Sequence, residues 1–287
     1  MRYVNCQLCP RRCGVDRSAG ETGWCGAPGG ALVAKAMLHK WEEPVLAGEG
    51  GSGAIFFGGC TLGCIYCQNR VISERPVGKT MDSPALRALM EDLIARGAEN
   101  IDLVTPTHFL PDIIPSLSPK LPVPVVYNCG GYERVETLRK LEGLVDIYLP
   151  DLKYTDSALA ARLSGAADYF PVAAAAIREM VRQTGPVQFD GDRLVRGTVI
   201  RHLILPGQVE NSLRALDWIG DNFAPGEVLV SLMRQYTPMP EVLGMPPMDR
   251  KVTDEEYDAV LSWMYLNDLE GFAQEEAAAG EGFIPDF

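Results

Sequence analysis

The chain has 287 residues, of which 47% are hydrophobic, and carries a formal net charge of −12. This length suits one large core in the size range of single α/β barrels. An acidic surface repels phosphate backbones, so we expect no nucleic-acid partner. The sequence shows neither the roughly 20 apolar residues of a membrane helix nor a signal-peptide core, so we expect a soluble, cytoplasmic protein without a membrane partner.

Seven of the eight cysteines lie within the first 67 residues, in two groups. Disulfide frameworks are typical of shorter secreted chains, whereas clustering in a large intracellular protein indicates metal binding. The first group comprises Cys6, Cys9, Cys13 and Cys25. Four thiols complete a closed metal site, which predicts either a structural zinc or a second [4Fe-4S] cluster. A structural role is favoured, because no ligand position stays open.

The second group, Cys60, Cys64 and Cys67, has the spacing Cys-x3-Cys-x2-Cys and follows the apolar run of residues 54–57. Three thiolates on one short loop can face a common point and leave one coordination position for a ligand that is not protein. An open position in a metal site indicates chemistry rather than architecture. The alternatives are a structural metal site or buried thiols.

Strand-like and helix-like segments alternate after residue 54. Ser83 and Pro84 predict the N-cap and first turn of a helix that Gly97 closes, and Thr253 with Glu256 predicts a capping box before a helix over residues 257–266. Further helices are predicted over residues 135–141, 170–182 and 211–222. Six apolar segments predict parallel strands covered on both faces: residues 54–58, 101–105, 124–128, 146–150, 199–205 and 227–232.

Six strand–helix units in a row predict an α/β fold with a parallel sheet and right-handed crossovers. The pattern alone is compatible with an open doubly wound sheet or with a partial barrel, and in both folds ligands bind at the carboxyl ends of the strands. We predict three regions: a cysteine-rich, metal-binding extension (1–50), a core (51–245), and a C-terminal helix and tail packed on the core (246–287). Residues 275–280 are predicted to form an acidic tail.

The cysteine triplet, the strand before it and the aromatic Tyr66 just before the last cysteine resemble the signature of the radical SAM superfamily. The resemblance implies a partial (β/α)6 TIM-type barrel, open at one side. It also implies that Cys60, Cys64 and Cys67 hold a [4Fe-4S] cluster whose fourth iron binds S-adenosylmethionine. One electron then cleaves S-adenosylmethionine to a 5′-deoxyadenosyl radical, which requires a reducing electron donor such as flavodoxin or ferredoxin.

Within that superfamily the chain is most similar to the pyruvate formate-lyase-activating-enzyme-like proteins that carry an added N-terminal cysteine segment. The similarity rests on the Cys-x-Leu-Cys-Pro-Arg-Arg-Cys-Gly-Val-Asp-Arg pattern at residues 6–17, on residues 51–53 and 67–69, and on the Phe-Ile-Pro-Asp-Phe run at 283–287. It extends over essentially the whole chain.

The resemblance implies cofactor contacts at successive strand ends. Thr105 or Thr107 stands where related enzymes bind the amino group of S-adenosylmethionine through Gly-Gly-Glu, which this chain lacks. Asn128 would lie near the ribose, and Tyr66 near the cluster. Arg201 would bind the S-adenosylmethionine carboxylate, since a guanidinium can bind a carboxylate through two hydrogen bonds. The alternative for Arg201 is a surface position.

Asp151 and Lys153 resemble the Asp-x-Lys signature of the activating enzymes, which implies a catalytic role in the pocket. The alternative is that they simply pair across the strand end. His108 and His202 are either site residues or satisfied structural groups. Cys129 is either a small core residue or a functional thiol.

These residues support three functional hypotheses. The first is a radical SAM oxidoreductase that abstracts hydrogen from a protein or peptide, with activation of a glycyl-radical enzyme as the named instance. The second keeps the radical chemistry but acts on a small metabolite. The third is a non-catalytic iron–sulfur protein for electron transfer.

Overall fold

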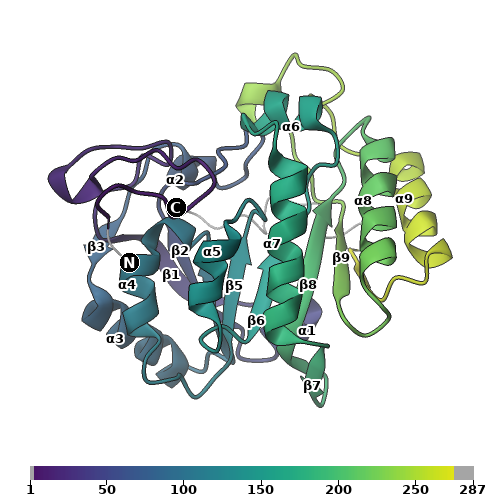
Figure 1. The fold of residues 1–287 in the computed structure, drawn as a ribbon. Helices are drawn as coiled ribbons and strands as arrows, with labels where there is room; N and C mark the ends of the chain where they lie inside the picture. Colours follow the sequence, from purple (N-terminus) through teal and green to yellow (C-terminus); the bar gives the residue numbers. More distant parts are fainter. Residues whose placement is uncertain (1–2, 275–287) are drawn as a thin grey trace.

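The computed structural model describes residues 3–274, which form one open mixed sheet with most of the helices on one face (Figure 1). The strand order is β10-β9-β8-β6-β5-β4-β2-β1-β3, with β7 paired to β8 off this path. The strands are β1 (Ala31–His39), β2 (Ser52–Phe57), β3 (Lys79–Met81), β4 (Asn100–Val104), β5 (Val125–Cys129), β6 (Ile147–Pro150), β7 (Gln188–Asp190), β8 (Arg193–Leu203), β9 (Leu229–Met233) and β10 (Gly271–Ala273).

The helices lie mainly in the connections between parallel strands. Helices α3, α4, α5, α7 and α8 lie in front of the sheet in Figure 1, and α9 packs outside α8. The helices are α1 (Pro44–Ala47), α2 (Arg70–Ser73), α3 (Ser83–Ala95), α4 (Leu110–Ser116), α5 (Val135–Leu138), α6 (Ser157–Ser164), α7 (Tyr169–Thr184), α8 (Val209–Asn222) and α9 (Asp254–Leu266). Helix α9 has the predicted capping box of Thr253 and Glu256.

The six predicted parallel strands are confirmed as β2, β4, β5, β6, β8 and β9, which are parallel neighbours in that order. The sheet is not closed by hydrogen bonds among the described residues, as a partial barrel requires. Strand β10 adds a further parallel strand next to β9. The antiparallel strands β1 and β3 were not predicted. Since β1 pairs with β2, the predicted boundary between residues 50 and 51 separates two strands of one sheet.

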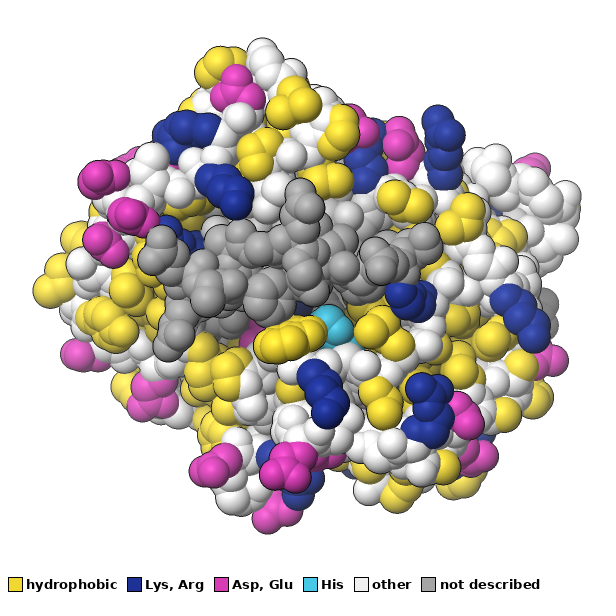
Figure 2. Space-filling view, turned by 180° about the vertical axis from the view of Figure 1, so that it is seen from behind, with side chains coloured by type: hydrophobic (Ala, Val, Ile, Leu, Met, Phe, Trp, Pro, Cys, Tyr) yellow, Lys and Arg dark blue, Asp and Glu magenta, His cyan; other side chains and the backbone are white. Residues whose placement is uncertain are grey.

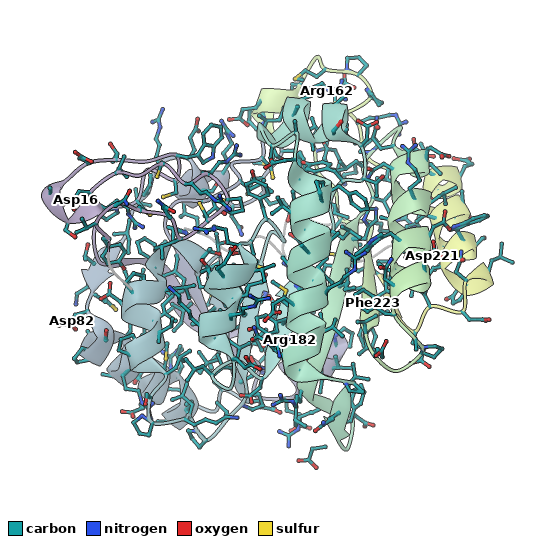
Figure 3. The ribbon with its side chains drawn as sticks, viewed as in Figure 1. Asp16, Asp82, Arg162, Arg182, Asp221 and Phe223 are labelled. Carbon is teal, nitrogen blue, oxygen red and sulfur yellow. The ribbon has the colours of Figure 1, made fainter. Side chains whose placement is uncertain are left out.

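The start of α3 differs from the prediction by one residue. Asp82, not Ser83, is the N-cap: its backbone is extended, and its carboxylate accepts the Ala85 N–H at 3.0 Å (Figure 3). An aspartate satisfies the free N–H groups of the first turn as well as a serine does, and its charge suits the positive end of the helix dipole. Gly97 follows the helix with φ 104°, as the predicted stop requires.

The barrel interior is apolar near the amino ends of the parallel strands and polar towards their carboxyl ends. Leu46 of α1 is 2% exposed and packs among inward-facing residues of the sheet, including Val126, Ile147, Val199 and Leu229. Helix α1 lies at the lower edge in Figure 1, opposite the upper edge that carries α2 and the N-terminal segment. The segment between β1 and β2 therefore closes one end of the barrel and leaves the other end to the loops that follow the strands.

Two arginines fix the N-terminal segment to the barrel. Arg17 is 2% exposed and donates hydrogen bonds to the carbonyl oxygens of Ala27, Pro28 and His108. Arg11 donates to four carbonyls: those of Thr61 and Leu62 in the loop after β2, and those of Ser164 and Gly165 at the end of α6. Its guanidinium also stacks on Trp24, 3.8 Å from the ring centroid. The segment therefore packs directly on the loop that carries the second cysteine group (residues 58–69, the cysteine loop).

The surface of the described residues mixes both signs of charge. Figure 2 views the molecule from behind and shows acidic and basic side chains interspersed around the margin of this face. Among residues 3–274, none of the helices has the length and apolar character that a membrane span requires. The predicted acidic tail (275–280) and the Phe-Ile-Pro-Asp-Phe run lie outside the described residues.

We predict that Arg11→Ala loosens the cysteine loop. Hydrogen bonds from a charged donor contribute roughly 1.5–3 kcal/mol, and about 1.4 kcal/mol is a factor of ten in an opening equilibrium. Amide hydrogen exchange across residues 60–66 should therefore be at least about tenfold faster than in the wild type. Arg12→Ala removes the neighbouring exposed arginine and is the matched control. Unchanged exchange in Arg11→Ala would contradict the proposed clamp.

Candidate functional site

The cysteine loop leaves the carboxyl end of β2 through a tight turn. Gly59 has φ 87°, and a Cβ at this position would lie 2.5 Å from the Cys25 carbonyl oxygen. Only glycine combines this left-handed backbone with so close an approach. Cys64 is 7% exposed, Cys60 and Cys67 are partly exposed, and all three are free thiols. The triplet therefore lies at the end of the sheet where parallel α/β folds bind ligands.

The sulfur atoms of this loop accept hydrogen bonds from the surrounding protein. The Leu62 N–H donates to Cys60 Sγ at 3.4 Å, and the Ser164 hydroxyl donates to Cys64 Sγ at 3.0 Å. Burial, together with the neighbouring thiols Cys64 and Cys67, raises the pKa of Cys60 to about 12. A positively charged centre would favour the thiolate form of Cys60, and the donors aimed at sulfur suit thiolate ligands of such a centre.

The predicted aromatic residue of the loop belongs to a buried hydroxyl network. Tyr66 is 4% exposed, and its hydroxyl lies 2.7 Å from that of Tyr154. The Tyr154 hydroxyl lies 2.6 Å from Ser164 Oγ, which in turn contacts Cys64. Tyr66 is therefore connected to the cysteine loop a second time, through a chain of hydroxyl groups that ends at Cys64 Sγ. Sequence reasoning missed Tyr154 and Ser164, since nothing in the pattern around them marks a site.

The structure brings together four of the predicted residues in one network. Arg201 Nε donates to Asp151 Oδ1 at 2.8 Å, and Arg201 Nη2 donates to Asn128 Oδ1 at 2.6 Å. Lys153 Nζ donates to the other oxygen of Asp151. Arg201 is thus an interior residue, not a surface one. Asp151 and Lys153 do pair with each other, as the alternative interpretation held, but within this larger network.

Electrostatics fix the charges of this network. Burial alone would raise the pKa of Asp151, but Arg201 and Lys153 outweigh burial and hold that pKa below its usual range. Burial alone would lower the pKa of Lys153, but the Asp151 carboxylate outweighs it and raises that pKa. Asp151 is therefore a carboxylate and Lys153 an ammonium. Tyr169 supports both, since its hydroxyl donates to the Asp151 carbonyl at 2.8 Å and accepts the Lys153 N–H at 3.0 Å.

The two threonines at the end of β4 differ in their surroundings. Thr107 is 1% exposed, and its hydroxyl donates to Glu133 Oε1 at 2.7 Å and accepts from Tyr127 at 3.0 Å. These two hydrogen bonds hold the Thr107 hydroxyl in a buried network with Glu133 and Tyr127. Thr105 is partly exposed and has φ 59°, a left-handed conformation that is uncommon for threonine. Strain of this kind clusters at functional sites, which favours Thr105 over Thr107 as a ligand contact.

The remaining histidines and the lone cysteine have structural surroundings. His202 is fully buried between the Leu152 carbonyl (2.6 Å) and the Ser212 hydroxyl (2.9 Å). His108 Nε2 lies 2.9 Å from the Gly58 carbonyl, where the cysteine loop begins. Cys129 is 2% exposed, and burial raises its pKa well above the usual value. These surroundings agree with the structural interpretation of His202 and Cys129, whereas His108 Nδ1 is buried and has no hydrogen-bond partner among the described residues.

A cavity of about 860 Å³ occupies the barrel interior beside this network. Asn128 and Arg201 line it, together with Gln68 and Asn69 of the cysteine loop. The volume lies within the range of roughly 300–1,000 Å³ that is typical of small-molecule sites. Glu42 and Glu43 line the same cavity, and Asp102 lies next to them. Sequence reasoning missed these acids, although an aspartate inside an otherwise apolar strand was a visible signal.

The four N-terminal thiols lie near one another on the segment that packs on the cysteine loop. Cys6 and Cys13 both act electrostatically on Cys25, and Cys6 and Cys25 act on Cys9. Burial raises the pKa of Cys9 to about 12. Within residues 3–274, no group of three or more His, Cys, Asp and Glu side chains is arranged to hold a single metal ion.

Comparisons with known proteins agree with this geometry. A family model described as a 4Fe-4S single cluster domain matches residues 46–107, which include the cysteine loop. Among curated proteins the chain is similar to "Uncharacterized protein MJ0674" of Methanocaldococcus jannaschii, with 30% identity over 269 residues that cover 90% of this chain and 74% of that protein.

Solved structures of radical SAM enzymes share the fold. A radical SAM methyltransferase from Sphaerobacter thermophilus has a TM-score of 0.54 at 12% identity, over 78% of this chain and 66% of its own. Streptococcus suis SuiB bound to S-adenosylmethionine has a TM-score of 0.51 at 13% identity, over 75% of this chain and 48% of SuiB, so the chain spans about half of SuiB. A second SuiB structure, bound to precursor peptide SuiA, has a TM-score of 0.51 at 14% identity, over 75% of this chain and 46% of SuiB.

These findings confirm the predicted radical SAM fold, while the pyruvate formate-lyase-activating-enzyme-like subgroup stays a prediction. The chain therefore belongs to the same protein family as the M. jannaschii protein, a family with the radical SAM fold.

Proposed function

We propose that this protein is a radical SAM enzyme in which Cys60, Cys64 and Cys67 hold a [4Fe-4S] cluster. The observation that carries the proposal is the position of three free thiols on one loop, at the carboxyl end of β2 and beside a large interior cavity. When bound and reduced, the cluster would supply the electron that cleaves S-adenosylmethionine to a 5′-deoxyadenosyl radical. A reducing donor such as flavodoxin or ferredoxin would deliver that electron.

The polar residues of the cavity would bind and orient S-adenosylmethionine. Arg201 is a permanent cation that lines the cavity and suits a carboxylate. Asn128 lines it as well, and Arg201 holds its amide in one orientation, which suits a ribose hydroxyl. Thr105 would contact the amino group, with Tyr66 bracing the loop. Asp151 would hold Arg201 in place, and Lys153, whose charge acts on Cys64 and Cys67, would place a fixed positive charge near the sulfur atoms.

A protein or peptide is the substrate class that the site supports best. Asp151 and Lys153 form the pair expected of an activating enzyme, and SuiB, which has a related fold, has been solved with a precursor peptide. Activation of a glycyl-radical enzyme is the specific instance, and a small metabolite is the alternative. Peptides from glycine-containing loops that bind no better than scrambled controls would exclude the activation hypothesis and favour the metabolite.

The N-terminal thiols Cys6, Cys9, Cys13 and Cys25 would hold a second metal site, either zinc or another [4Fe-4S] cluster. Four thiols on one short segment, with neighbours that affect one another electrostatically, support this proposal. Iron and zinc counts per chain separate the two occupants, because a second cluster gives about eight irons and a zinc site leaves about four.

We predict that anaerobically reconstituted protein releases 5′-deoxyadenosine when dithionite and S-adenosylmethionine are added. Replacement of Cys60, Cys64 or Cys67 by alanine should abolish that release and remove about four irons, because each thiol is one of only three protein ligands. Cys129→Ala is the matched control, since Cys129 is a buried thiol that does not belong to the cysteine loop. Intact S-adenosylmethionine with a fully reduced four-iron protein, even with candidate substrates added, would favour the electron-transfer hypothesis instead.

We also predict that Ser164→Ala lowers the reduction potential of the cluster. A hydrogen bond to a cysteine sulfur favours the more negative, reduced state, so its removal disfavours reduction. About 1.4 kcal/mol corresponds to 59 mV in a one-electron couple, so a shift on the order of 50 mV is expected in an EPR-monitored redox titration. Ser116→Ala removes an equally buried hydroxyl, which donates to the Ile113 carbonyl, and should leave the potential unchanged.

A further inference from the structure

Two buried hydroxyl groups in series lead to the sulfur of Cys64. The Ser164 hydroxyl lies 3.0 Å from Cys64 Sγ, and the Tyr154 hydroxyl lies 2.6 Å from Ser164 Oγ. Tyr154 is fully buried, Ser164 is 2% exposed and Cys64 is 7% exposed. Bulk water is therefore largely excluded from these contacts, and in such surroundings a hydrogen bond has a larger electrostatic effect than in water.

The main chain of Ser164 is fixed next to the cysteine loop. The Ile65 N–H donates to the Leu163 carbonyl at 2.9 Å, and Arg11 donates to the Ser164 carbonyl at 2.9 Å. These bonds hold the end of α6 against the loop, but they do not restrict rotation about the Cβ–Oγ bond of the serine. The direction of the Ser164 hydroxyl proton therefore depends on the groups that contact its oxygen.

Ligation of a metal centre by Cys64 determines which of these groups donates. A ligating cysteine is a thiolate, which only accepts hydrogen bonds, so Ser164 has to donate to it. Because a hydroxyl carries one proton, the Ser164 oxygen then accepts at its contact with Tyr154. Tyr154 is thus the donor to Ser164 whenever Cys64 is a ligand. A free Cys64 thiol also allows the other order, in which Tyr154 donates to the Tyr66 hydroxyl at 2.7 Å.

The position of Tyr154 is set by the strand end that carries the Arg201 network. Tyr154 follows Lys153 shortly after β6, and its ring packs edge-on against that of Tyr169, with 5.1 Å between the ring centroids. The Tyr169 hydroxyl donates to the Asp151 carbonyl and accepts the Lys153 N–H. The Tyr154 hydroxyl therefore reaches Ser164 from a well-packed element.

We propose that Tyr154 is a positioning residue for the cluster: by donating to Ser164, it directs the Ser164 proton onto Cys64 Sγ and raises the reduction potential. A donor at a ligating sulfur stabilises the more negative, reduced state. The inference rests on the proposed function, because it requires the cluster that this proposal places on Cys60, Cys64 and Cys67. Tyr154 belongs neither to the cysteine loop nor to the lining of the cavity.

The test is an EPR-monitored redox titration of the anaerobically reconstituted protein, without S-adenosylmethionine. Tyr154→Phe keeps the ring and its packing but removes the hydroxyl. The Ser164 hydroxyl then has three staggered positions, of which one points at the sulfur. The equilibrium constant for reduction of the cluster should therefore fall about threefold, which is about 28 mV in a one-electron couple. An unchanged or higher potential would overturn the inference.

A double variant separates positioning from a direct effect on the cluster. If Tyr154 acts through Ser164, then Tyr154→Phe combined with Ser164→Ala shifts the potential no further than Ser164→Ala alone. Shifts that add in the double variant would mean that Tyr154 acts on the cluster without Ser164, which contradicts the proposed role.

Tyr148→Phe is the matched control. Tyr148 is fully buried on β6, and its hydroxyl donates to Gln183 Oε1 at 2.6 Å. Each of the two substitutions removes one tyrosine hydroxyl that bonds a side chain, so both should lower the Tm by similar amounts. Only Tyr154→Phe should change the potential. An equal change in Tyr148→Phe would make the shift a general consequence of a lost buried hydroxyl, and the inference would fail.

The redox titration needs the cluster but not the cleavage of S-adenosylmethionine. A protein that releases 5′-deoxyadenosine, but whose potential does not respond to Tyr154→Phe, would overturn this inference and leave the proposed function intact. A protein that shows the expected shifts but never cleaves S-adenosylmethionine, with candidate substrates included, would overturn the proposed function and retain the role of Tyr154.

Discussion

The Arg201 guanidinium lies inside the barrel, where an uncompensated charge would carry a large desolvation cost. Its position on β8 determines what the neighbouring strands must supply. Strand β5 contributes Asn128 as an acceptor, and Asp151 directly after β6 contributes the counter-charge. Because β5, β6 and β8 are adjacent parallel strands, their ends reach one point without any distortion of the sheet. The buried ion pair thus aligns the three strand ends that border the cavity.

The same guanidinium cannot neutralise everything around it. Asp151 forms ion pairs with Arg201 and Lys153, while Glu42, Glu43 and Asp102 interact with the same guanidinium over a longer distance. The cavity therefore has two electrostatically different ends. The end near the cysteine loop carries the positive charge of Arg201 and suits anionic groups of a ligand, whereas carboxyl groups gather near α1, where burial raises the pKa of Glu42 well above its usual value. A ligand that bridges them would be oriented by charge before any close contact forms.

The sequence predicts this protein best where one local pattern is sufficient. The six parallel strands are continuous apolar runs, and the capping box before α9 is set by two residues three apart. Strand β1 escaped prediction because its partners are β2 and β3, and pairing is a tertiary property that a single segment does not encode. At the start of α3, two adjacent residues could each serve as the cap, and only the backbone conformation decides between them.

The candidate site also combines features that a local pattern predicts with features that only tertiary contacts determine. The triplet and the polar strand ends were visible, because spacing and strand termini are sequence properties. The roles of the two threonine hydroxyls were not visible, because Thr105 and Thr107 look equivalent in the sequence. Only the hydrogen bond from Thr107 to Glu133, 26 positions away, distinguishes Thr107 as a buried structural residue. Glu42, Glu43 and Asp102 come together through the curvature of the sheet. Contacts of that range depend on closure of the fold, so no local pattern signals them.

Strand β1 makes the cysteine-rich extension inseparable from the barrel. All six residues of β2 are buried, and β1 covers the outer edge of that strand along its whole length. Removal of residues 1–50 would leave an apolar β2 with unpaired backbone groups, which is the kind of edge that recruits strands from other molecules. The extension is thus no detachable module. In grafting or domain exchange within this family, the first 50 residues and the first barrel strand would have to be transferred as one unit.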